Sequence, residues 1–261
     1  MSDEFKKSSQ SIADSSGFPL QIRIADITNS SSDWKVYVEE YPWRSELTHS
    51  EGFIDLVIHR KESFSAMVIE CKRVRDTAWV FLIPEKKPNE RSDARLWLSN
   101  YVPLKWDRFD WSNDYPASPS SYESRFCAIP GQVHGRLTIL ERTASDLIEA
   151  VEALALQEKK IVSSDPNVGR PFGRVYIPVI ITTAEIRVSF FEPSSISLSD
   201  GSLPADTEFK IIPYIRFRKS LTRQVNSSRH KSLKDAYKAS ERTVFIVNAE
   251  SWDGFLNKWS I

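Results

Sequence analysis

The chain has 261 residues, 41% of them hydrophobic, and its 35 basic side chains are balanced by 35 acidic ones. A formal net charge of zero excludes binding of a polyanion through bulk charge, so any nucleic-acid surface must be a local patch. The hydrophobic content, with eight Trp, eight Tyr and fourteen Phe, excludes general disorder.

The cysteine count and the hydropathy pattern exclude further classes of protein. Cys71 and Cys127 are too few for a disulfide framework or a zinc cluster. Because no apolar run reaches about 18 residues, we expect no membrane span, and a cytoplasmic location with reduced thiols is the simplest interpretation. Residues 1–17 are polar and Ser-rich and lack the apolar segment of a secretory signal, so we expect a flexible tail before a single domain at 18–261.

The first structured segment is predicted at residues 18–31. Leu20, Ile24 and Ile27 have helical spacing, whereas Ile22 and Ile24 alternate with polar residues as in a strand. We favour a helix here because of the elements that follow.

Short runs rich in Val, Ile and aromatic residues predict strands at 34–42, 52–60, 65–74 and 78–84. The residues at 61–63 fit a tight turn that joins the second and third of these strands into a hairpin. Residues 85–136 hold many Pro, Ser and Asp residues, which favour an insertion of loops and short helices. Three tryptophans, at 97, 106 and 111, are expected to pack this insertion.

A long helix is predicted at 143–161, with Thr143 or Ser145 as its cap and an apolar stripe along one face. The apolar run at 175–184 predicts a buried strand. Further strands are expected in IRVSFFE and FKIIPYIRF. RTVFIVNAE is predicted to close the sheet, and a short last helix begins near Ser251. This order of elements predicts an α/β fold with a central mixed sheet covered by helices.

Asp55 and Glu70 stand out because each lies within an apolar strand. Burial of a lone carboxylate costs several kcal/mol unless something compensates it. Two such groups on adjacent strands suggest a shared divalent cation, and two carboxylates with a backbone carbonyl suit Mg²⁺. The alternative is a salt-bridge network at a sheet edge.

Lys72 follows Glu70 by two residues, so both side chains point to one face of the strand and Cys71 points to the other. A lysine side chain beside the cation can orient a water molecule, or deprotonate it as the free amine, and as the ammonium it can offset charge in a phosphoryl transition state. The pattern therefore favours phosphodiester hydrolysis. Cys71 is expected to be a packing thiol rather than a nucleophile.

The segments FIDLVI and MVIECKR, at 53–58 and 67–73, resemble the core of the PD-(D/E)xK, restriction-endonuclease-like nucleases. Asp55 matches the first acid of the motif, although Ile54 stands where the family name has proline, and Glu70-Cys71-Lys72 matches the E-x-K motif. The resemblance covers residues 18–84 well and 140–250 loosely. It implies a restriction-endonuclease-like core of αβββαβ order, with a central mixed β-sheet flanked by helices and an insertion at about 85–136 after the third core strand.

The resemblance also implies a ligand set. Asp55, Glu70 and Lys72 would be catalytic, and Asp55, Glu70 and the Cys71 carbonyl would hold Mg²⁺, for which Mn²⁺ would substitute. Many members use an acid from the first helix, but that helix offers Gln21 and Asp26 and no glutamate. Glu40 is our candidate replacement, with Glu39 and Glu51 as alternatives and plain surface charge as the other interpretation.

Cations near the motif are candidate phosphate contacts. Arg73 and Arg75 follow Lys72 directly, and a basic stretch covers residues 216–238. The other interpretation of this stretch is a solvated face or loop. The nucleic-acid-binding candidates are Arg73, Arg75, Arg216, Arg218, Lys219 and Arg223.

The sequence therefore predicts a metal-dependent nuclease acting on nucleic acid, DNA more than RNA. A role in restriction or anti-phage defence, and a protein partner or a homodimer, follow from the habits of the family alone. One alternative is a catalytically silent module of the same fold that binds nucleic acid or a protein. The other is an interaction protein without metal, whose two acids are structural.

Overall fold

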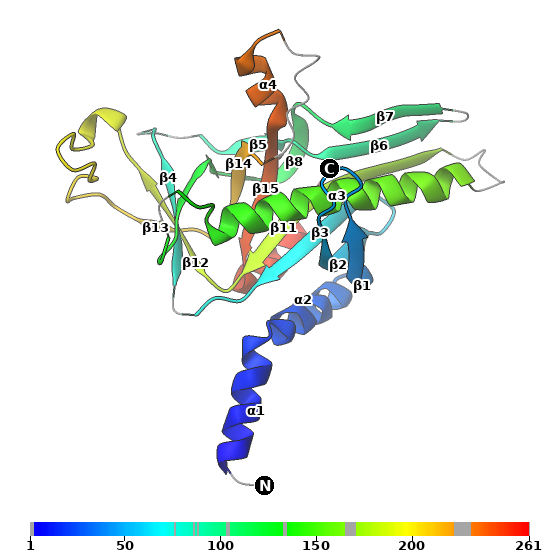
Figure 1. Cartoon of the computed structure of the whole chain (residues 1–261), viewed down its shortest axis with the longest axis horizontal. Coiled ribbons are helices and arrows are strands. Elements are labelled where there is room, and N and C mark those ends of the chain that lie inside the picture. Colours follow the sequence, from blue (N-terminus) through cyan, green and yellow to red (C-terminus); the bar gives the residue numbers. More distant parts are fainter. Residues whose placement is uncertain are drawn as a thin grey trace.

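The computed structural model of the chain describes residues 3–75, 77–85, 87, 89–102, 105–132, 135–164, 171–221 and 231–260. It is a mixed α/β fold with a central mixed sheet flanked by helices (Figure 1). No helix in these residues is both long and apolar enough to cross a membrane.

Nine strands form the central sheet in the described part of the chain, in the order β1-β2-β3-β11-β15-β14-β9, with β6 and β7 joined to it through β11. The first three strands are an antiparallel meander, and β11 runs parallel to both β3 and β15. The bounds are β1 Trp34–Arg44, β2 Glu51–Arg60, β3 Ser65–Lys72, β6 Trp97–Val102, β7 Lys105–Trp111, β9 Glu123–Ser124, β11 Phe172–Thr182, β14 Tyr214–Ser220 and β15 Glu241–Asn248.

Strand β11 is the centre of this sheet. One edge pairs with β3 along residues 175–182. The other edge pairs first with β6, through residues 172–176, and then with β15, through residues 179–182. Both faces and both edges of β11 are covered. Its almost continuously apolar sequence, which predicts a buried strand, agrees with this position.

Two smaller sheets complete the strand structure among the residues described. A four-stranded sheet has the order β10-β4-β12-β13, and β5 pairs with β8 alone. Their bounds are β4 Ala78–Ile83, β5 Arg91–Ala94, β8 Tyr115–Ser121, β10 Phe126–Ala128, β12 Glu185–Phe190 and β13 Lys210–Ile211.

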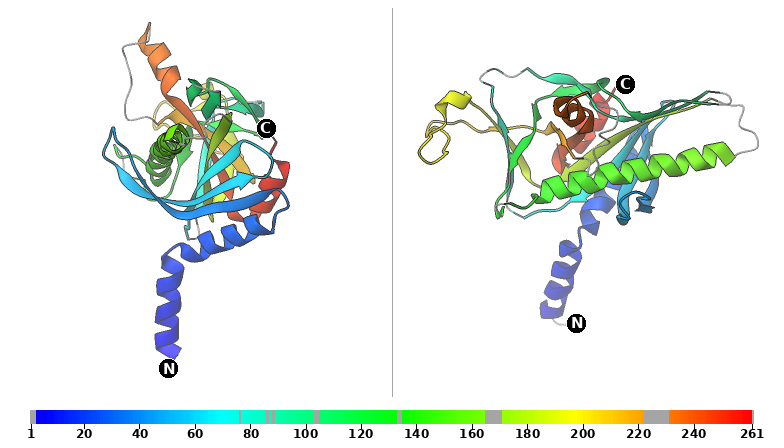
Figure 2. Two further views of the ribbon diagram at one scale, coloured as in Figure 1. Left: turned by 90° about the vertical axis from the view of Figure 1, so that its right-hand side faces the viewer. Right: turned by 45° about the horizontal axis from the view of Figure 1, so that its top comes forward.

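Helices cover both faces of the central sheet (Figure 2). Helix α3 packs with alternate strand residues into one cluster, the α3-side core, which includes Leu147, Val151 and Val68. Helices α2 and α5 pack on the other face into the α2-side core, which includes Ile24 and Phe255. The helix bounds are α1 Asp3–Ser15, α2 Phe18–Ser30, α3 Ile139–Ser164, α4 Leu233–Ser240 and α5 Trp252–Lys258, with 3-10 turns at Pro193–Ser195 and Ala249–Ser251.

The predicted helix at 18–31, the strand meander, its hairpin turn, the buried strand and the last helix are confirmed. In the segment 1–17, helix α1 occupies most of the residues and extends away from the body (Figures 1 and 2). The flexibility that we expect there stays a prediction.

The predicted short helices at 85–136 are wrong, because the described residues of this segment form strands β5 to β10. Proline misled the prediction: Pro116 and Pro119 lie in β8, which pairs on one edge only and so tolerates a missing donor. The tryptophans do pack the segment, since Trp97 contacts Trp111 edge to face and Phe109 lies against both Trp97 and Trp106.

The strand order also differs from the prediction. Strands β4 and β12, expected in one central sheet, pair with each other in the four-stranded sheet. Strand β15, expected to close the central sheet, lies inside it between β11 and β14. A local apolar segment predicts that a strand forms, but which strand it pairs with depends on long-range packing.

Helix α3 begins four residues before the predicted start, and its cap is neither Thr143 nor Ser145, which are both buried within the helix. The Oγ1 of Thr138 accepts from the N–H of Glu141 at 3.1 Å, and the Glu141 carboxylate accepts from the N–H of Thr138 at 2.8 Å. This reciprocal pair is a capping box.

We predict that Thr138→Ala lowers the free energy of unfolding by about 1 kcal/mol, because the backbone N–H of Glu141 at the start of α3 loses its partner. Urea unfolding followed by tryptophan fluorescence measures this change. Ser30→Ala, at the exposed end of α2, is the control and should change stability by less than about 0.5 kcal/mol. Equal effects of the two substitutions would contradict the assigned cap.

Candidate active site

The candidate site forms where the alternation of strands β1 and β2 is interrupted. Val38 and Tyr41 both pack on the α3-side core, although they are three residues apart, and their register partners Val57 and Ile54 do the same. The alternation therefore shifts by one residue in both strands, between these two pairs. Glu40, in this interval, has a φ of 49°, an uncommon value for a residue other than glycine.

Asp55 lies in the same interval of β2, opposite Glu40. The ladder between β2 and β3 ends at the pair Leu56 and Ile69, one residue before Asp55. Beyond it, the Oδ2 of Asp55 accepts from the backbone N–H of Cys71 at 2.6 Å. The Asp55 carboxylate thus accepts from a backbone N–H of β3 that has no partner in the β2–β3 ladder. This hydrogen bond holds the carboxylate beside Glu70 and Lys72.

Glu70 and Lys72 form an ion pair at 2.6 Å between Nζ and Oε1. Their side chains remain 21% and 31% exposed, so solvent reaches both groups. Both line a cavity of about 210 Å³ between the start of β2 and helix α3. Cys71 instead packs with the α2-side core, as strand alternation predicts.

Gln21 of helix α2 connects the first helix to this site. Its amide Nε2 donates to Oε1 of Glu40 at 2.6 Å and to the backbone carbonyl of Asp55 at 3.1 Å. Gln21 is only 6% exposed, which is unusual for an amide side chain and is explained by these two bonds. The position at which the family resemblance looks for an acid therefore holds a neutral side chain that orients Glu40.

The electrostatics of the site are unfavourable for two ionised acids. Burial, followed by repulsion from Glu70, raises the pKa of Asp55 to about 7. Burial also raises the pKa of Glu70, against the opposing effect of Lys72, and Asp146 and Glu40 add repulsion. Burial raises the pKa of the Cys71 thiol well above its ordinary value, so this thiol is not an activated nucleophile.

These shifts bear on whether the site fits a divalent cation. Two neighbouring carboxylates whose charges repel are the arrangement that a hard cation compensates. Mg²⁺ keeps several water ligands, so two carboxylates and a carbonyl are a sufficient protein contribution. Within the residues that the structure describes, no three His, Cys, Asp or Glu side chains gather as a metal-binding group, and Glu40 is thus not part of a preformed three-acid cluster.

Asp146 is a residue of the site that sequence reasoning missed. It lines the cavity of Glu70 and Lys72 from helix α3, together with Thr143 and Ala150. The spacing of these three positions, at i, i+3 and i+7, places them on one helical face. An acid between the small, uncharged Thr143 and Ala150 was the signal that could have identified it.

The structure corrects part of the predicted phosphate-binding set. Arg216 is fully buried, and its guanidinium group donates to the Ser121 hydroxyl and to the backbone carbonyls of Asp93, Ala117 and Pro119 at 2.5–3.1 Å. It therefore has a structural role and does not face a ligand. Both faces of strand β14 are covered at this point, since the neighbouring Ile215 and Phe217 are buried as well.

The other candidates divide into two groups. Arg218, with a side chain 15% exposed, forms ion pairs with four acids, and Lys219 pairs with Glu141, so both are engaged in structural contacts. Arg223 lies outside the described residues. Arg73 is half-buried and Arg75 exposed, immediately after β3, and they remain the candidates nearest to Lys72.

Comparison of the chain with protein-family models, with curated proteins and with solved structures found no match. Interpretation of this site therefore depends on its geometry and chemistry.

We predict that Asp55→Asn removes a pH-dependent loss of stability. The pKa of about 7 in the folded state exceeds the ordinary value of 3.8, so the folded protein binds a proton that the unfolded chain releases. The contribution of Asp55 to stability is then fully present below pH 4 and is lost as the pH rises through about 7. The side-chain oxygen of the asparagine still accepts from the N–H of Cys71. At pH 8 the free energy of unfolding of Asp55→Asn should therefore exceed that of the wild-type protein by on the order of 3 kcal/mol.

Urea unfolding at pH 5 and pH 8, in EDTA to remove cations, measures this effect. Asp110→Asn, an exposed acid on β7, is the matched control. If the wild-type protein and Asp55→Asn lose the same stability between the two pH values, the assigned position of Asp55 is wrong.

Proposed function

We propose that this protein is a metal-dependent nuclease that hydrolyses phosphodiester bonds, with DNA as the preferred substrate. The observation that supports it most is the meeting of Asp55, Glu70 and Lys72 where the β2–β3 ladder ends, beside a cavity that solvent reaches. Structural acids in a salt-bridge network would be expected to have pKa values lowered by their partners, whereas those of Asp55 and Glu70 are raised.

The order of elements supports the same proposal. Helix α2, strands β1 to β3, helix α3 and strand β11 follow one another in the αβββαβ order, with strands β4 to β10 inserted after β3. Strand β11 lies next to β3 and parallel to it, and the two helices cover opposite faces of the sheet. We propose on this basis that the core is restriction-endonuclease-like.

Each residue of the site has a role in the proposed reaction. Asp55 and Glu70 would hold Mg²⁺, with the Cys71 carbonyl as a further ligand, and Glu40 is the weaker candidate. When bound, the cation would polarise the phosphoryl oxygens and neutralise developing charge. The Lys72 ammonium would orient the attacking water and stabilise the negative charge of the transition state. Gln21 would position Glu40 without contacting the substrate.

The wider context is also a proposal. The free thiols Cys71 and Cys127 suit a cytoplasmic location. Restriction or anti-phage defence, and a protein partner or a homodimer, follow only from the family that the motif resembles. RNA is the second substrate to test, because a protein can distinguish RNA from DNA only where it contacts the 2′-hydroxyl group.

We predict that the purified protein cleaves DNA with Mg²⁺ or Mn²⁺ and that Lys72→Ala lowers the rate by about 10²–10⁴-fold, because water activation and charge stabilisation are lost. Cleavage of plasmid DNA and of labelled RNA, resolved on gels, measures activity and substrate class. Lys61→Ala, on the turn at the other end of the β2–β3 hairpin, is the control and should cut at the wild-type rate. Equal rates for Lys72→Ala and wild type would contradict the role of Lys72.

One observation favours a second candidate, a silent module of this fold. Lys72 engages Glu70 at 2.6 Å, which uses one carboxylate oxygen that a cation would need. Calorimetric titration with Mn²⁺ separates the two functions, because a nuclease binds the ion and Asp55→Asn weakens that binding. No heat of binding, together with no cleavage of DNA or RNA, favours the silent module.

We further predict that Arg73→Ala combined with Arg75→Ala reduces the salt dependence of DNA binding. Each phosphate contact that is lost lowers the slope of log K against log salt by about one. Fluorescence anisotropy at several salt concentrations, without Mg²⁺, measures the slope. Lys35→Ala combined with Lys61→Ala, at the opposite end of the strands, should leave it unchanged; an equal change in both double variants would show that only net charge matters.

A further inference from the structure

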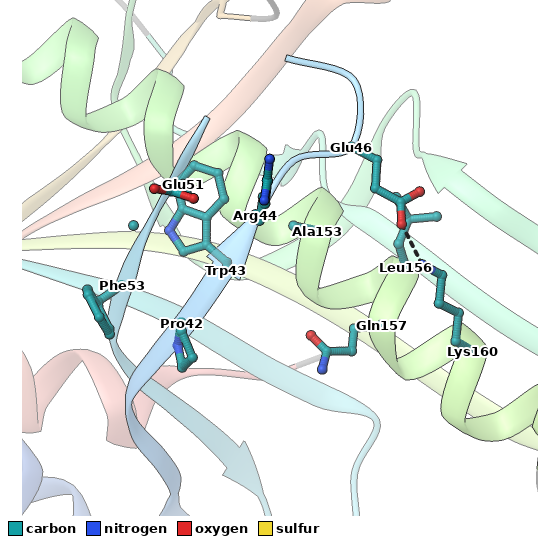
Figure 3. A pocket seen from close by; sticks show the side chains of 11 residues that line it. Pro42, Trp43, Arg44, Glu46, Glu51, Phe53, Ala153, Leu156, Gln157 and Lys160 are labelled. Carbon is teal, nitrogen blue, oxygen red and sulfur yellow. Dashed lines mark hydrogen bonds and ion pairs between the residues drawn. The ribbon is translucent and has the colours of Figure 1, made fainter. Parts of the chain in front are cut away.

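A groove of about 770 Å³ lies beside the candidate site, between the β1–β2 hairpin and helix α3 (Figure 3). Apolar side chains from both elements line it, among them Trp43, Ala153 and Leu156. It shares Trp43 and residues 51–53 with the smaller cavity that contains Glu70 and Lys72. A ligand in the groove is therefore adjacent to the proposed reacting centre.

Polar contacts join the hairpin tip to helix α3. The Thr48 hydroxyl donates to Oε2 of Glu149 at 2.7 Å, and Lys160 pairs with Glu46 at 2.5 Å across the groove (Figure 3). The indole of Trp43 lies against Gly52, where an added Cβ would be 3.2 Å from its Nε1. The first two contacts join the hairpin tip to α3, and the third packs Trp43 onto strand β2.

The charges of the groove are balanced. Lys160 is paired with Glu46, and Arg44 faces its register partner Glu51 across the hairpin. A channel for the sugar-phosphate backbone needs an excess of cations, which these residues do not supply. Apolar walls with balanced charges instead suit a flat, neutral group.

We propose that this groove binds an unpaired nucleobase of the strand that is cut. The inference rests on the proposed nuclease function and specifies its substrate: single-stranded nucleic acid, or a duplex with an unpaired nucleotide next to the cleaved bond. A paired base in an intact duplex is stacked between its neighbours and reaches such a pocket only after extrusion. Aromatic and aliphatic walls bind any base without reading its edge, so the groove gives strand selectivity rather than sequence selectivity.

The test is a cycle that combines a change in the protein with a change in the substrate. Gln157 extends from α3 into the groove at an exposed position (Figure 3), and Gln157→Trp fills the space. Binding to oligodeoxythymidylate and to an abasic oligonucleotide of the same length is measured by fluorescence anisotropy. Lys72→Ala is the background in all proteins, so that substrates stay intact. Oligouridylate replaces oligodeoxythymidylate in a parallel arm to separate RNA from DNA.

We expect Gln157→Trp to weaken binding of oligodeoxythymidylate by about 5-fold or more and to leave binding of the abasic strand within about 2-fold. Leu156→Asn, which makes the wall polar without filling the groove, should act in the same direction. Asn257→Trp on helix α5, an exposed amide on the other face of the sheet, is the matched control and should leave both affinities unchanged. Thermal melting of each variant verifies that it is folded.

The outcomes separate the two proposals. If Gln157→Trp weakens binding of oligodeoxythymidylate and of the abasic oligonucleotide equally, or weakens neither, the proposal that the groove binds a base is wrong. The proposed nuclease function stands in that case if the wild-type protein cleaves nucleic acid. If the protein binds neither strand and cuts no nucleic acid, both proposals are wrong.

Discussion

The bond between the Asp55 carboxylate and the backbone N–H of Cys71 is the interaction on which the site depends. Backbone pairing between β2 and β3 ends just before it, and an uncompensated strand donor at that depth would cost free energy. The side chain of Asp55 satisfies the donor and is itself fixed in position. This one hydrogen bond thus lies where the β2–β3 ladder ends, orients the Asp55 carboxylate and keeps it next to Glu70 and Lys72.

The same interruption brings together groups from both faces of the sheet. Glu70 and Lys72 face helix α3 and its Asp146, whereas Gln21 approaches from α2 on the opposite face. In a regularly alternating sheet, side chains on opposite faces are separated by the backbone. The shift at Glu40 and Asp55 lets Gln21 reach a backbone carbonyl and a carboxylate at one point, so residues of both layers contribute to one electrostatic environment.

Local sequence patterns were sufficient for the elements around the site. Apolar runs gave the three-stranded meander and the buried strand β11, the order of these elements decided between helix and strand for α2, and the apolar surroundings of Asp55 and Glu70 identified both acids. Pattern alone could not show that Asp55 binds Cys71, because that bond depends on where two strands stop pairing. It also misassigned Arg216: a basic run in sequence resembles a surface, but both faces of β14 are covered at this point, and surrounding carbonyl groups satisfy the guanidinium. Partner choice between distant strands, as for β4 with β12, is set by packing that no local window contains.

Strand β11 has a consequence for how the chain reaches its native state. It pairs with β3, β6 and β15, segments that are separated from one another by tens to more than one hundred residues. During synthesis, the β1–β3 meander emerges long before β11. Until then, the edge of β3 that pairs with β11 and much of both apolar faces of the meander stay uncovered. High contact order of this kind slows folding and exposes strand edges to other nascent chains. The insertion and the core share this strand, because β11 pairs with β6 of the insertion as well as with β3 and β15.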